Sequence, residues 1–548
     1  MALKKKMMFM LAVMGCIMVM ALPAMALDVD FSGSFEVEGI LNSSENMDKN
    51  DSTSDFRQMR LRVQTDFTIT DDLKLTTRFD ALEKVLSSKD SAFTTTFNDT
   101  GWDANQDDDN IDFDRAYLSW KSPIGFFQIG RMEGVTWGTS FADDESDTDR
   151  VKYILPIPLG DGTMYVSAVA EKVTENDKGP LISDADNDKY YVGLTYKAKN
   201  YTTGLLSALY NFKQFQDPGQ AFATADFTSA HAENSTKSDF KNFVATTDGQ
   251  SNSVTSYANW YGVGATAYKT AYMTALAGGA SSAAAQAAAG GAAVTAAGQD
   301  WLSSGVDSAS ASAFLTRGKT CEAKVFLLAP YFEGKFGDLN ISTELDYVFG
   351  PATYDTNADD QDIKAFAYFV EGSYDLGPAT VELGFAHSKG DANYTDDTIE
   401  SMGYVSPGAD WAKLFILNDD SHGMNGSLAG GVGNHMGDGF ATASTAMCDG
   451  YQMLYGGVDY DVTDTIALGF IAGISKADEV PDGMQYDDDQ GIEYDASFTW
   501  NLTKNLEYKA IAAYLDGGDY WATRSTGSID SEIDPQIYTL YHKLTLTF

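Results

Sequence analysis

Cysteine is almost missing from this sequence, and its scarcity removes several kinds of site. Only Cys16, Cys321 and Cys448 occur in 548 residues. There is no C-x-x-C-H, so the chain binds no c-type haem covalently, and no paired C-x-x-C, so a cysteine zinc site is excluded. In an oxidising compartment Cys321 and Cys448 are a possible disulfide, and two free thiols are the alternative.

Basic charge, proline and long apolar runs are also in short supply. Lys and Arg number 37 against 79 Asp and Glu, a formal charge of −42 that argues against nucleic acid as a partner. Beyond the N-terminus the best membrane-helix candidate, 271–297, is nearly all Ala, Gly, Ser and Thr, which insert poorly. With 12 Pro against 29 Tyr, 31 Phe and 50 Gly, the composition favours strands joined by tight turns.

The first 26 residues have the pattern of a secretory signal peptide. Lys4 to Lys6 form the charged region, 7–22 the apolar region, and Ala24-Met25-Ala26 the cleavage site. A lipoprotein signal ending at Cys16 is the alternative, disfavoured because the apolar run continues past it. We therefore expect an exported protein whose mature part, 27–548, is a single domain.

The mature chain alternates strictly between apolar and polar residues over segments of about ten. Met59, Leu61 and Val63 alternate with Arg60 and Arg62, for example. This period of two predicts strands that separate lipid from water. They are expected at 29–41, 57–69, 73–85, 111–121, 125–133, 149–156, 163–172, 188–198, 201–213, 322–336, 339–349, 363–375, 378–388, 451–462, 465–476, 490–502, 505–516 and 536–548. The segment 149–156 is the weakest because two prolines crowd its end, so sixteen strands is the alternative to eighteen.

The connections between these segments alternate in length. Every second one is a short turn, whereas the others include the long polar loops 86–110, 214–320 and 389–450. Short periplasmic turns and long extracellular loops are characteristic of outer-membrane barrels. We predict an all-β fold, a transmembrane antiparallel up-and-down β-barrel in the bacterial outer membrane, rather than a soluble sandwich. The Ala-rich part of 214–320 is either a flexible flap or short helices over the mouth.

The last eleven residues agree with this architecture. Tyr538, Leu540, Leu544 and Leu546 share one face of the segment, and the chain ends at Phe548. A terminal Phe after such a strand resembles the C-terminal signature of bacterial outer-membrane β-barrels. His542 departs from the pattern, since it falls on the apolar face.

Arginine is concentrated early in the chain, where seven of nine lie between residues 57 and 150. Alternation directs Arg60, Arg62, Arg78, Arg115 and Arg131 into the lumen as a basic ladder. After the fifth strand comes an acidic loop with Asp143, Asp144 and Glu145. This constellation resembles that of the Gram-negative general diffusion porins, in which the loop after the fifth strand folds inward and faces basic residues. The alternative is that the arginines only neutralise neighbours such as Asp66 and Asp80.

The resemblance implies a passive, water-filled channel for ions and small hydrophilic solutes, with the arginines and the acidic loop at its constriction. It also implies a homotrimer surrounded by outer-membrane lipid and lipopolysaccharide. The opposite wall is expected to be acidic, and since carboxylates outnumber arginines overall, we predict a preference for cations. The wall residues are Glu344, Asp346, Asp459, Asp461, Glu493 and Asp495.

Other activities find less support in the residues. Acidic loop runs such as Asp107-Asp108-Asp109 suit loose Ca²⁺ or Mg²⁺ binding, and no firm metal site or cofactor is predicted. The five histidines belong to no nucleophile motif, so an enzyme is not expected. A substrate-selective channel for sugars or carboxylates, and a structural barrel around an electron-transfer partner, remain as alternatives.

Overall fold

The architecture was taken from a computed structural model. It describes residues 28–44, 53–86, 111–134, 136–143, 146–175, 186–217, 319–354, 360–392, 397–400, 411, 413–418, 449–480, 487–523 and 534–548, with a few isolated positions elsewhere. The signal peptide and most of the three long loops therefore lie outside the described residues. So do Cys448, Asp144 and Glu145, which leaves the disulfide and part of the acidic loop as predictions.

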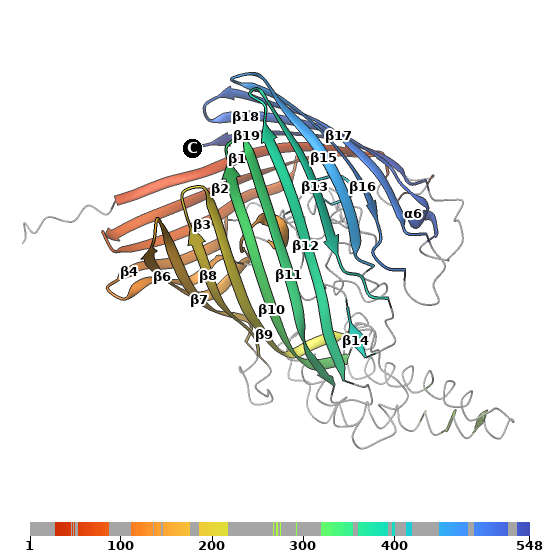
Figure 1. The fold of residues 1–548 in the computed structure, drawn as a ribbon, viewed down its shortest axis with the longest axis horizontal. Helices are drawn as coiled ribbons and strands as arrows, with labels where there is room; N and C mark the ends of the chain where they lie inside the picture. Colours follow the sequence, from red (N-terminus) through yellow and green to blue (C-terminus); the bar gives the residue numbers. More distant parts are fainter. Residues whose placement is uncertain are drawn as a thin grey trace, which may run out of the picture.

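Eighteen antiparallel strands close into a barrel (Figure 1). They are β1 (Asp28–Asn42), β2 (Ser54–Thr70), β3 (Leu73–Val85), β4 (Ile111–Ser122), β5 (Gly125–Glu133), β6 (Asp147–Leu159), β7 (Gly162–Thr174), β8 (Asn187–Lys197), β9 (Tyr201–Asp217), β10 (Lys319–Phe336), β11 (Leu339–Tyr354), β12 (Gln361–Asp375), β13 (Ala379–Ser388), β15 (Tyr451–Thr463), β16 (Ile466–Lys476), β17 (Asp489–Thr503), β18 (Leu506–Asp516) and β19 (Gln536–Thr547). Closure is direct, because β1 pairs with both β2 and β19. The predicted fold and strand count are confirmed, and sixteen is wrong.

A short strand and a short α-helix lie off this wall. The two-residue strand β14 (Thr398–Ile399) pairs in parallel with β12, and the short helix α6 (Asp519–Thr523) follows β18. Tyr520 and Trp521 of α6 are buried at the end of the barrel away from the short turns. Among the described residues no helix is long and apolar enough to cross a bilayer.

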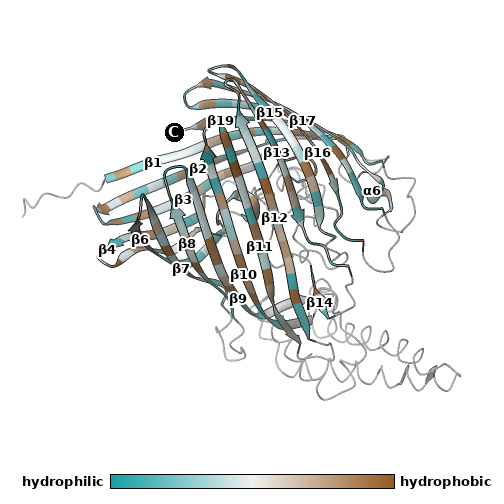
Figure 2. Ribbon diagram, in the orientation of Figure 1, coloured by the Kyte–Doolittle hydropathy of each residue, from teal (hydrophilic) through white to brown (hydrophobic). Residues whose placement is uncertain are grey.

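The outer surface of the barrel is apolar. Large side chains such as Leu383 and Val192 are 64% and 56% exposed, on strands whose other face is turned inward. The hydrophobic residues recur along the visible strands in Figure 2. Exposed apolar residues at every second position belong to a wall that contacts lipid. The chain is thus an outer-membrane barrel.

Aromatic side chains gather at two heights on this outer face. Near the short turns, Trp120 stacks on Phe127 with ring centroids 5.6 Å apart. Farther along the strands, Phe326 stacks on Phe349 at 5.4 Å. Such paired girdles mark the two interfaces of the hydrocarbon layer.

The prolines of β6 do not end the strand as expected. Pairing with β5 stops at Ile154, whereas pairing with β7 continues to Leu159. Pro156 and Pro158 thus lie in a stretch without a neighbour on one side, where a missing N–H leaves no ladder bond unmade. For this reason the strand ends three residues later than predicted, at Leu159.

The C-terminal strand closes the barrel as its alternation predicts. Phe548 exchanges two backbone hydrogen bonds with Gly33 of β1. His542 does lie on the outer face, where it covers Gly39: a Cβ added to that glycine would be 2.6 Å from the imidazole Nε2. The missing side chain of Gly39 makes room for the one residue that breaks the apolar pattern.

Short turns connect the strands at the end of the barrel where the C-terminus lies, at the upper left of Figure 1. Gly160, Gly337 and Gly377 in three of these turns have φ values of +61°, +68° and +83°, which favour glycine. Among the described connections, the short turns all lie at this end of the barrel, as the alternation of connection lengths predicts.

Candidate functional site

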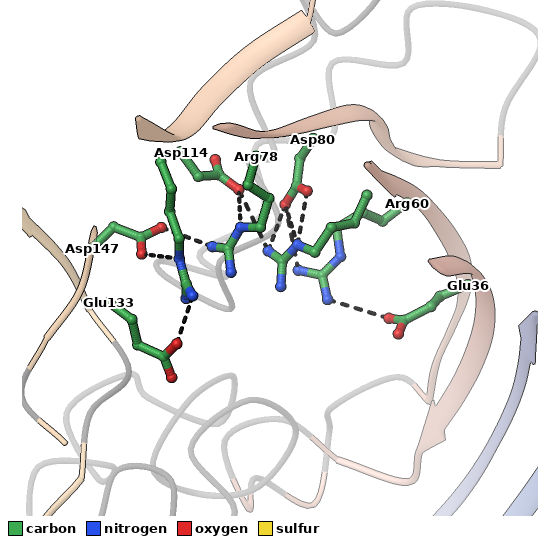
Figure 3. A network of polar contacts seen from close by, with 9 residues as sticks. Glu36, Arg60, Arg78, Asp80, Asp114, Glu133 and Asp147 are labelled. Carbon is green, nitrogen blue, oxygen red and sulfur yellow. Dashed lines mark hydrogen bonds and ion pairs between the residues drawn. The ribbon is translucent and has the colours of Figure 1, made fainter. Parts of the chain in front are cut away.

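Four of the five predicted ladder arginines join in one chain of alternating charges, which we call the arginine network (Figure 3). Its members, in order, are Glu36, Arg60, Asp80, Arg62, Asp114, Arg78, Asp147, Arg115 and Glu133. The nitrogen–oxygen distances run from 2.5 Å between Arg115 and Asp147 to 4.0 Å between Arg60 and Asp80. Each inner carboxylate thus bridges two guanidinium groups.

Strand register explains how the network forms. Arg62 is paired directly with Asp80 across β2 and β3, so their side chains share the inner face. Between β3 and β4 the register shifts: Arg78 pairs with Arg115, but Phe79 pairs with Phe113. The extra residue of this bulge is Asp114, whose carboxylate contacts Arg78 and Arg62. The carboxylate of Asp147 contacts both facing arginines and so offsets their like charges.

The partners of the ladder differ from those predicted. Asp147, within the expected acidic loop but not among the three residues assigned to the constriction, contacts both Arg78 and Arg115, at 2.8 and 2.5 Å. Asp80 forms an ion pair with Arg62, as the alternative of neighbouring charges that neutralise one another predicts. Asp66, the other acid named in that alternative, pairs with Lys74 and not with an arginine. Because the sequence pattern assigned acidity to a whole loop, it could not single out the residue that reaches the arginines.

Arg131 is a correction to the predicted ladder. It pairs with Asp149 at 3.5 Å, and both side chains are about half exposed or more, at 49% and 64%. Its position along β5 has the same parity as Ile129, which is exposed on the lipid side. Arg131 therefore lies on the outer face, at the end of a strand, and is no part of the lumen.

The loop after β5 does fold into the barrel, as the porin resemblance implies. Its described part, 136–143, is the first inward segment and contains the 3-10 helix η1 (Ser140–Ala142). Phe141 is fully buried against Phe369 and Trp411, at ring distances of 4.9 and 5.1 Å. The indole Nε1 of Trp137 donates to the backbone carbonyl of Ala329 on β10.

Carboxylates hold this first inward segment, but not as predicted. Asp143 accepts a 2.6 Å hydrogen bond from the backbone N–H of Trp137, within the segment itself. Glu344 of β11 accepts from the N–H and the hydroxyl of Thr139, at 2.7 and 2.6 Å. Asp143 is thus an internal cap rather than a group that faces the arginines.

A second inward segment, 411 and 413–418, was not predicted. The backbone N–H groups of Ile416 and Leu417 donate to Glu493 of β17, at 2.5 and 2.7 Å. That of Phe415 donates to Asp495 at 2.9 Å. Figure 1 labels β17 among the blue strands, and β18, β19 and β1 separate it from β2 in the barrel.

Side chains complete the anchoring of this second segment. Lys413 lies 2.6 Å from Glu371 of β12 and 3.5 Å from Glu382 of β13. Asn418 accepts from the N–H of Leu414, at 2.7 Å, and so caps the turn from within. The signal available in the sequence was the apolar run Leu414 to Leu417, unusual inside a polar loop.

The predicted acidic wall consequently divides into two groups. Glu344, Asp346, Glu493 and Asp495 are 1%, 0%, 0% and 5% exposed, so they do not line open water as expected. Asp459 and Asp461 are exposed on the inner face of β15. Alternation correctly turned all six inward, but it carries no information about which would be covered by a loop.

One lumen cavity beside these groups, which we call the main lumen cavity, has a volume of about 690 Å³. It lies between the second inward segment and strands β15 to β19 and β1. Its charged lining comprises Glu36, Glu382, Asp459, Asp495, Glu507, Lys413, Lys509 and Lys543. Five carboxylates thus face three lysines.

Among the described residues no group of three His, Cys, Asp or Glu side chains could hold a metal ion. The acidic runs proposed for loose cation binding fall largely outside those residues. His387, the histidine with a carboxylate contact, lies 2.6 Å from Asp478. Gln452 and the N–H of Gly390 share that carboxylate, which joins three segments near the end of β13.

Comparisons with known proteins rest on structure. No protein-family model and no curated protein matches the chain. OccAB2 of Acinetobacter baumannii is similar over 95% of this chain and 98% of its own, with 8% identity and a TM-score of 0.45. OccK8 (OprE) of Pseudomonas aeruginosa is similar over 95% of this chain and 98% of its own, with 10% identity and a TM-score of 0.43. OmpT, an outer membrane protein of Vibrio cholerae, is similar over 96% of this chain and 99% of its own, with 10% identity and a TM-score of 0.37. All three likenesses extend over nearly the full length of both chains.

Proposed function

We propose that this protein is a passive outer-membrane channel for ions and small hydrophilic solutes, narrowed from within by its two inward segments. The observation that carries the proposal is the main lumen cavity, about 690 Å³ in volume and lined by eight charged side chains. Charged groups that line an enclosed space inside a lipid-facing wall suit the passage of hydrated solutes.

The charges of the lumen favour cations. The arginine network holds four arginines and five carboxylates, and Lys543 contacts Glu36 at 3.3 Å, so five cations balance five anions. The ladder is therefore not a positive wall. The main lumen cavity, with five carboxylates and three lysines, carries a net charge of −2 by count. A carboxylate-rich passage lowers the barrier for cations.

A substrate-selective channel is a second candidate, supported by the presence of two anchored inward segments instead of one. Phe141 of the first segment and Trp411 of the second are in T-shaped contact at 5.1 Å. Segments that meet across the lumen leave less room than a single loop would, and a narrow passage restricts the solutes that enter it.

Planar-bilayer recording of the purified protein tests these proposals. We expect discrete conductance steps, and a reversal potential that indicates cation preference under a potassium chloride gradient. A size series of neutral sugars and carboxylates then separates general diffusion, in which flux falls smoothly with size, from saturable flux of one solute. Absence of conductance would overturn the channel and favour a structural barrel around a partner.

The homotrimer and the absence of enzymatic activity remain predictions. Analytical ultracentrifugation in detergent, with the detergent contribution matched by density, measures the oligomeric state. We expect three copies per particle, and a monodisperse monomer would contradict that expectation.

A further inference from the structure

A second lumen cavity, separate from the arginine network, has the features of a binding site. We call it the aromatic cavity; its volume is about 360 Å³, and it lies between strands β6 to β11 and the first inward segment. Its lining includes Trp137, Tyr165, Tyr191 and Tyr210. The volume falls in the range of pockets that hold small molecules.

One end of the aromatic cavity carries buried carboxyl groups whose oxygens lack hydrogen-bond donors. Asp346 is fully buried, and neither of its carboxyl oxygens has a partner among the described residues. Glu344, 1% exposed, binds Thr139 through one oxygen only, and its Oε1 is likewise unpartnered within the described part of the chain. Buried polar atoms are nearly always satisfied, so these three oxygens point to a donor that the protein itself does not supply.

Basic groups line another part of the same cavity. Lys152 of β6 makes no ion pair with any residue that the structure describes, and Lys197 of β8 is exposed beside the cavity. Arg150 is bound to Glu171, and its Nε has no partner among the described residues. Lys152 thus adds a cationic group that forms no ion pair within the described part of the chain.

The aromatic walls of this cavity are fixed in place. Trp137 is held by its hydrogen bond to Ala329 and packs at 5.4 Å, edge to face, on Tyr331. Gly193 and Gly204 leave space for its indole: a Cβ at either would lie 2.8 or 3.0 Å from the ring. The side chain that narrows this cavity is therefore positioned by three different strands, β8, β9 and β10.

We propose that the aromatic cavity binds a small zwitterionic solute with an apolar body, of the aromatic amino acid class. Its ammonium group would donate to the free oxygens of Asp346 and Glu344, and its carboxylate would accept from Lys152. The ring would lie against Trp137 and the tyrosines. An ammonium satisfies both the charge and the hydrogen-bonding capacity of an acidic pair, which a sugar hydroxyl does only in part. This inference rests on the proposed channel function, because the solute must enter the lumen.

The experiment compares three probes that share one phenyl body: L-phenylalanine, 3-phenylpropanoate and 2-phenylethylamine. The readout is the probe concentration that halves the single-channel current. We expect L-phenylalanine to act at a concentration at least about tenfold lower than either singly charged probe, since each charged hydrogen bond contributes an order of magnitude. Equal potency of the three would overturn the proposal.

Two substitutions assign the ends of the site. Lys152→Met should raise the half-blocking concentrations of L-phenylalanine and 3-phenylpropanoate about tenfold and leave that of 2-phenylethylamine unchanged. Asp346→Asn should raise the half-blocking concentrations of L-phenylalanine and 2-phenylethylamine. Asp461→Asn, on the opposite wall, is the matched control and should alter none. The assignment is wrong if neither cavity variant raises the half-blocking concentrations of its two expected probes. It is also wrong if glucose blocks the current at the same concentration as L-phenylalanine.

Calorimetry of the detergent-solubilised full chain with L-phenylalanine keeps the two proposals distinguishable. Heat of binding that Asp346→Asn abolishes, without any conductance, would refute the channel and retain the site. Conductance with no heat and no current block would retain the channel and refute the site. Heat-modifiable migration on gels, which reports a closed barrel, confirms that each variant is folded.

Discussion

The two walls of the lumen use charge in opposite ways. On β2 to β4, arginines and carboxylates of neighbouring strands neutralise one another side chain to side chain, as in the 2.6 Å pair of Arg62 and Asp80. On β11 and β17, the carboxylates of Glu344 and Glu493 accept backbone N–H groups of segments that cross the lumen. The described contacts of the first wall join side chains of the strands to one another, whereas those of the second join strands to a loop segment.

This difference has an energetic reason. A salt bridge between partly exposed side chains contributes little, because water screens it and compensates for its loss. A backbone N–H buried inside the barrel has no such compensation, and losing its acceptor costs the desolvation of that group. The acidic wall is therefore expected to be far more sensitive to substitution than the arginine wall.

The largest effect should come from Glu493→Ala. It leaves the N–H groups of Ile416 and Leu417 without acceptors in a buried position, at a cost of roughly 2–6 kcal/mol for the two donors. We expect the second inward segment to leave the lumen, and the single-channel conductance to rise. Hydrogen exchange of the peptide that spans 411–418 should lose its protection.

Glu493→Gln serves as the matched control for this substitution. It keeps one acceptor oxygen and nearly the same volume, so an intermediate loss of protection is expected. Unchanged protection in the alanine variant would show that Glu493 does not anchor the segment.

A smaller effect is expected from Glu344→Ala on the first inward segment. Only the backbone N–H of Thr139 loses its acceptor without a replacement, because the hydroxyl can rotate to another acceptor. The cost in stability is about 1–3 kcal/mol. The bonds of Trp137 to Ala329 and to Asp143 remain. We expect partial loss of amide protection over 136–143, measured against Ser342→Ala on the same strand. Loss as complete as in Glu493→Ala would mean that the two segments depend equally on one carboxylate.

The comparison also shows how far the sequence alone leads. Strict alternation located all eighteen strands, and the inward orientation of Arg62 and Glu493 followed from it, because a period of two assigns each residue to a face. What covers an inward residue is decided by loops far away in sequence. Residues 411–418 lie some 75 positions before Glu493, and no local pattern reports that contact.

Two failures have local causes instead. Arg131 was assigned to the lumen although its parity along β5 matches that of Ile129, which faces lipid. Asp147 was missed as the partner of Arg78 because the constriction was assigned to Asp143, Asp144 and Glu145 of the same loop, although Asp147 lies before the strand predicted to begin at 149. Parity along β5 gives the correct side for Arg131. Asp147 has the parity of the exposed Val151 and reaches the arginines from the end of its strand, so parity does not identify it.

A moderate effect is expected from breaking the arginine wall at Arg62→Ala. The side chain is 29% exposed and bonds to Asp80, so its loss should cost about 1 kcal/mol of stability after screening. Removing one of five balanced cations should also shift the reversal potential toward stronger cation preference. Arg131→Ala, on the outer face, is the control and should shift neither. A loss of stability above that of Glu344→Ala would reverse the proposed ranking of the walls.

The smallest effect should come from Asp459→Asn, an acidic-wall residue that holds no segment. Its carboxylate is exposed in the main lumen cavity, where no described backbone N–H donates to it, so the change in unfolding free energy should stay within about 0.5 kcal/mol. Cation preference should weaken, because the cavity loses one of its five carboxylates, and the effect should diminish in high salt as screening increases. Reversal potentials at low and high potassium chloride measure both. A loss of hydrogen-exchange protection in the second inward segment of Asp459→Asn would contradict this expectation. Exposure would then not distinguish the carboxylates that anchor the segment from those that do not.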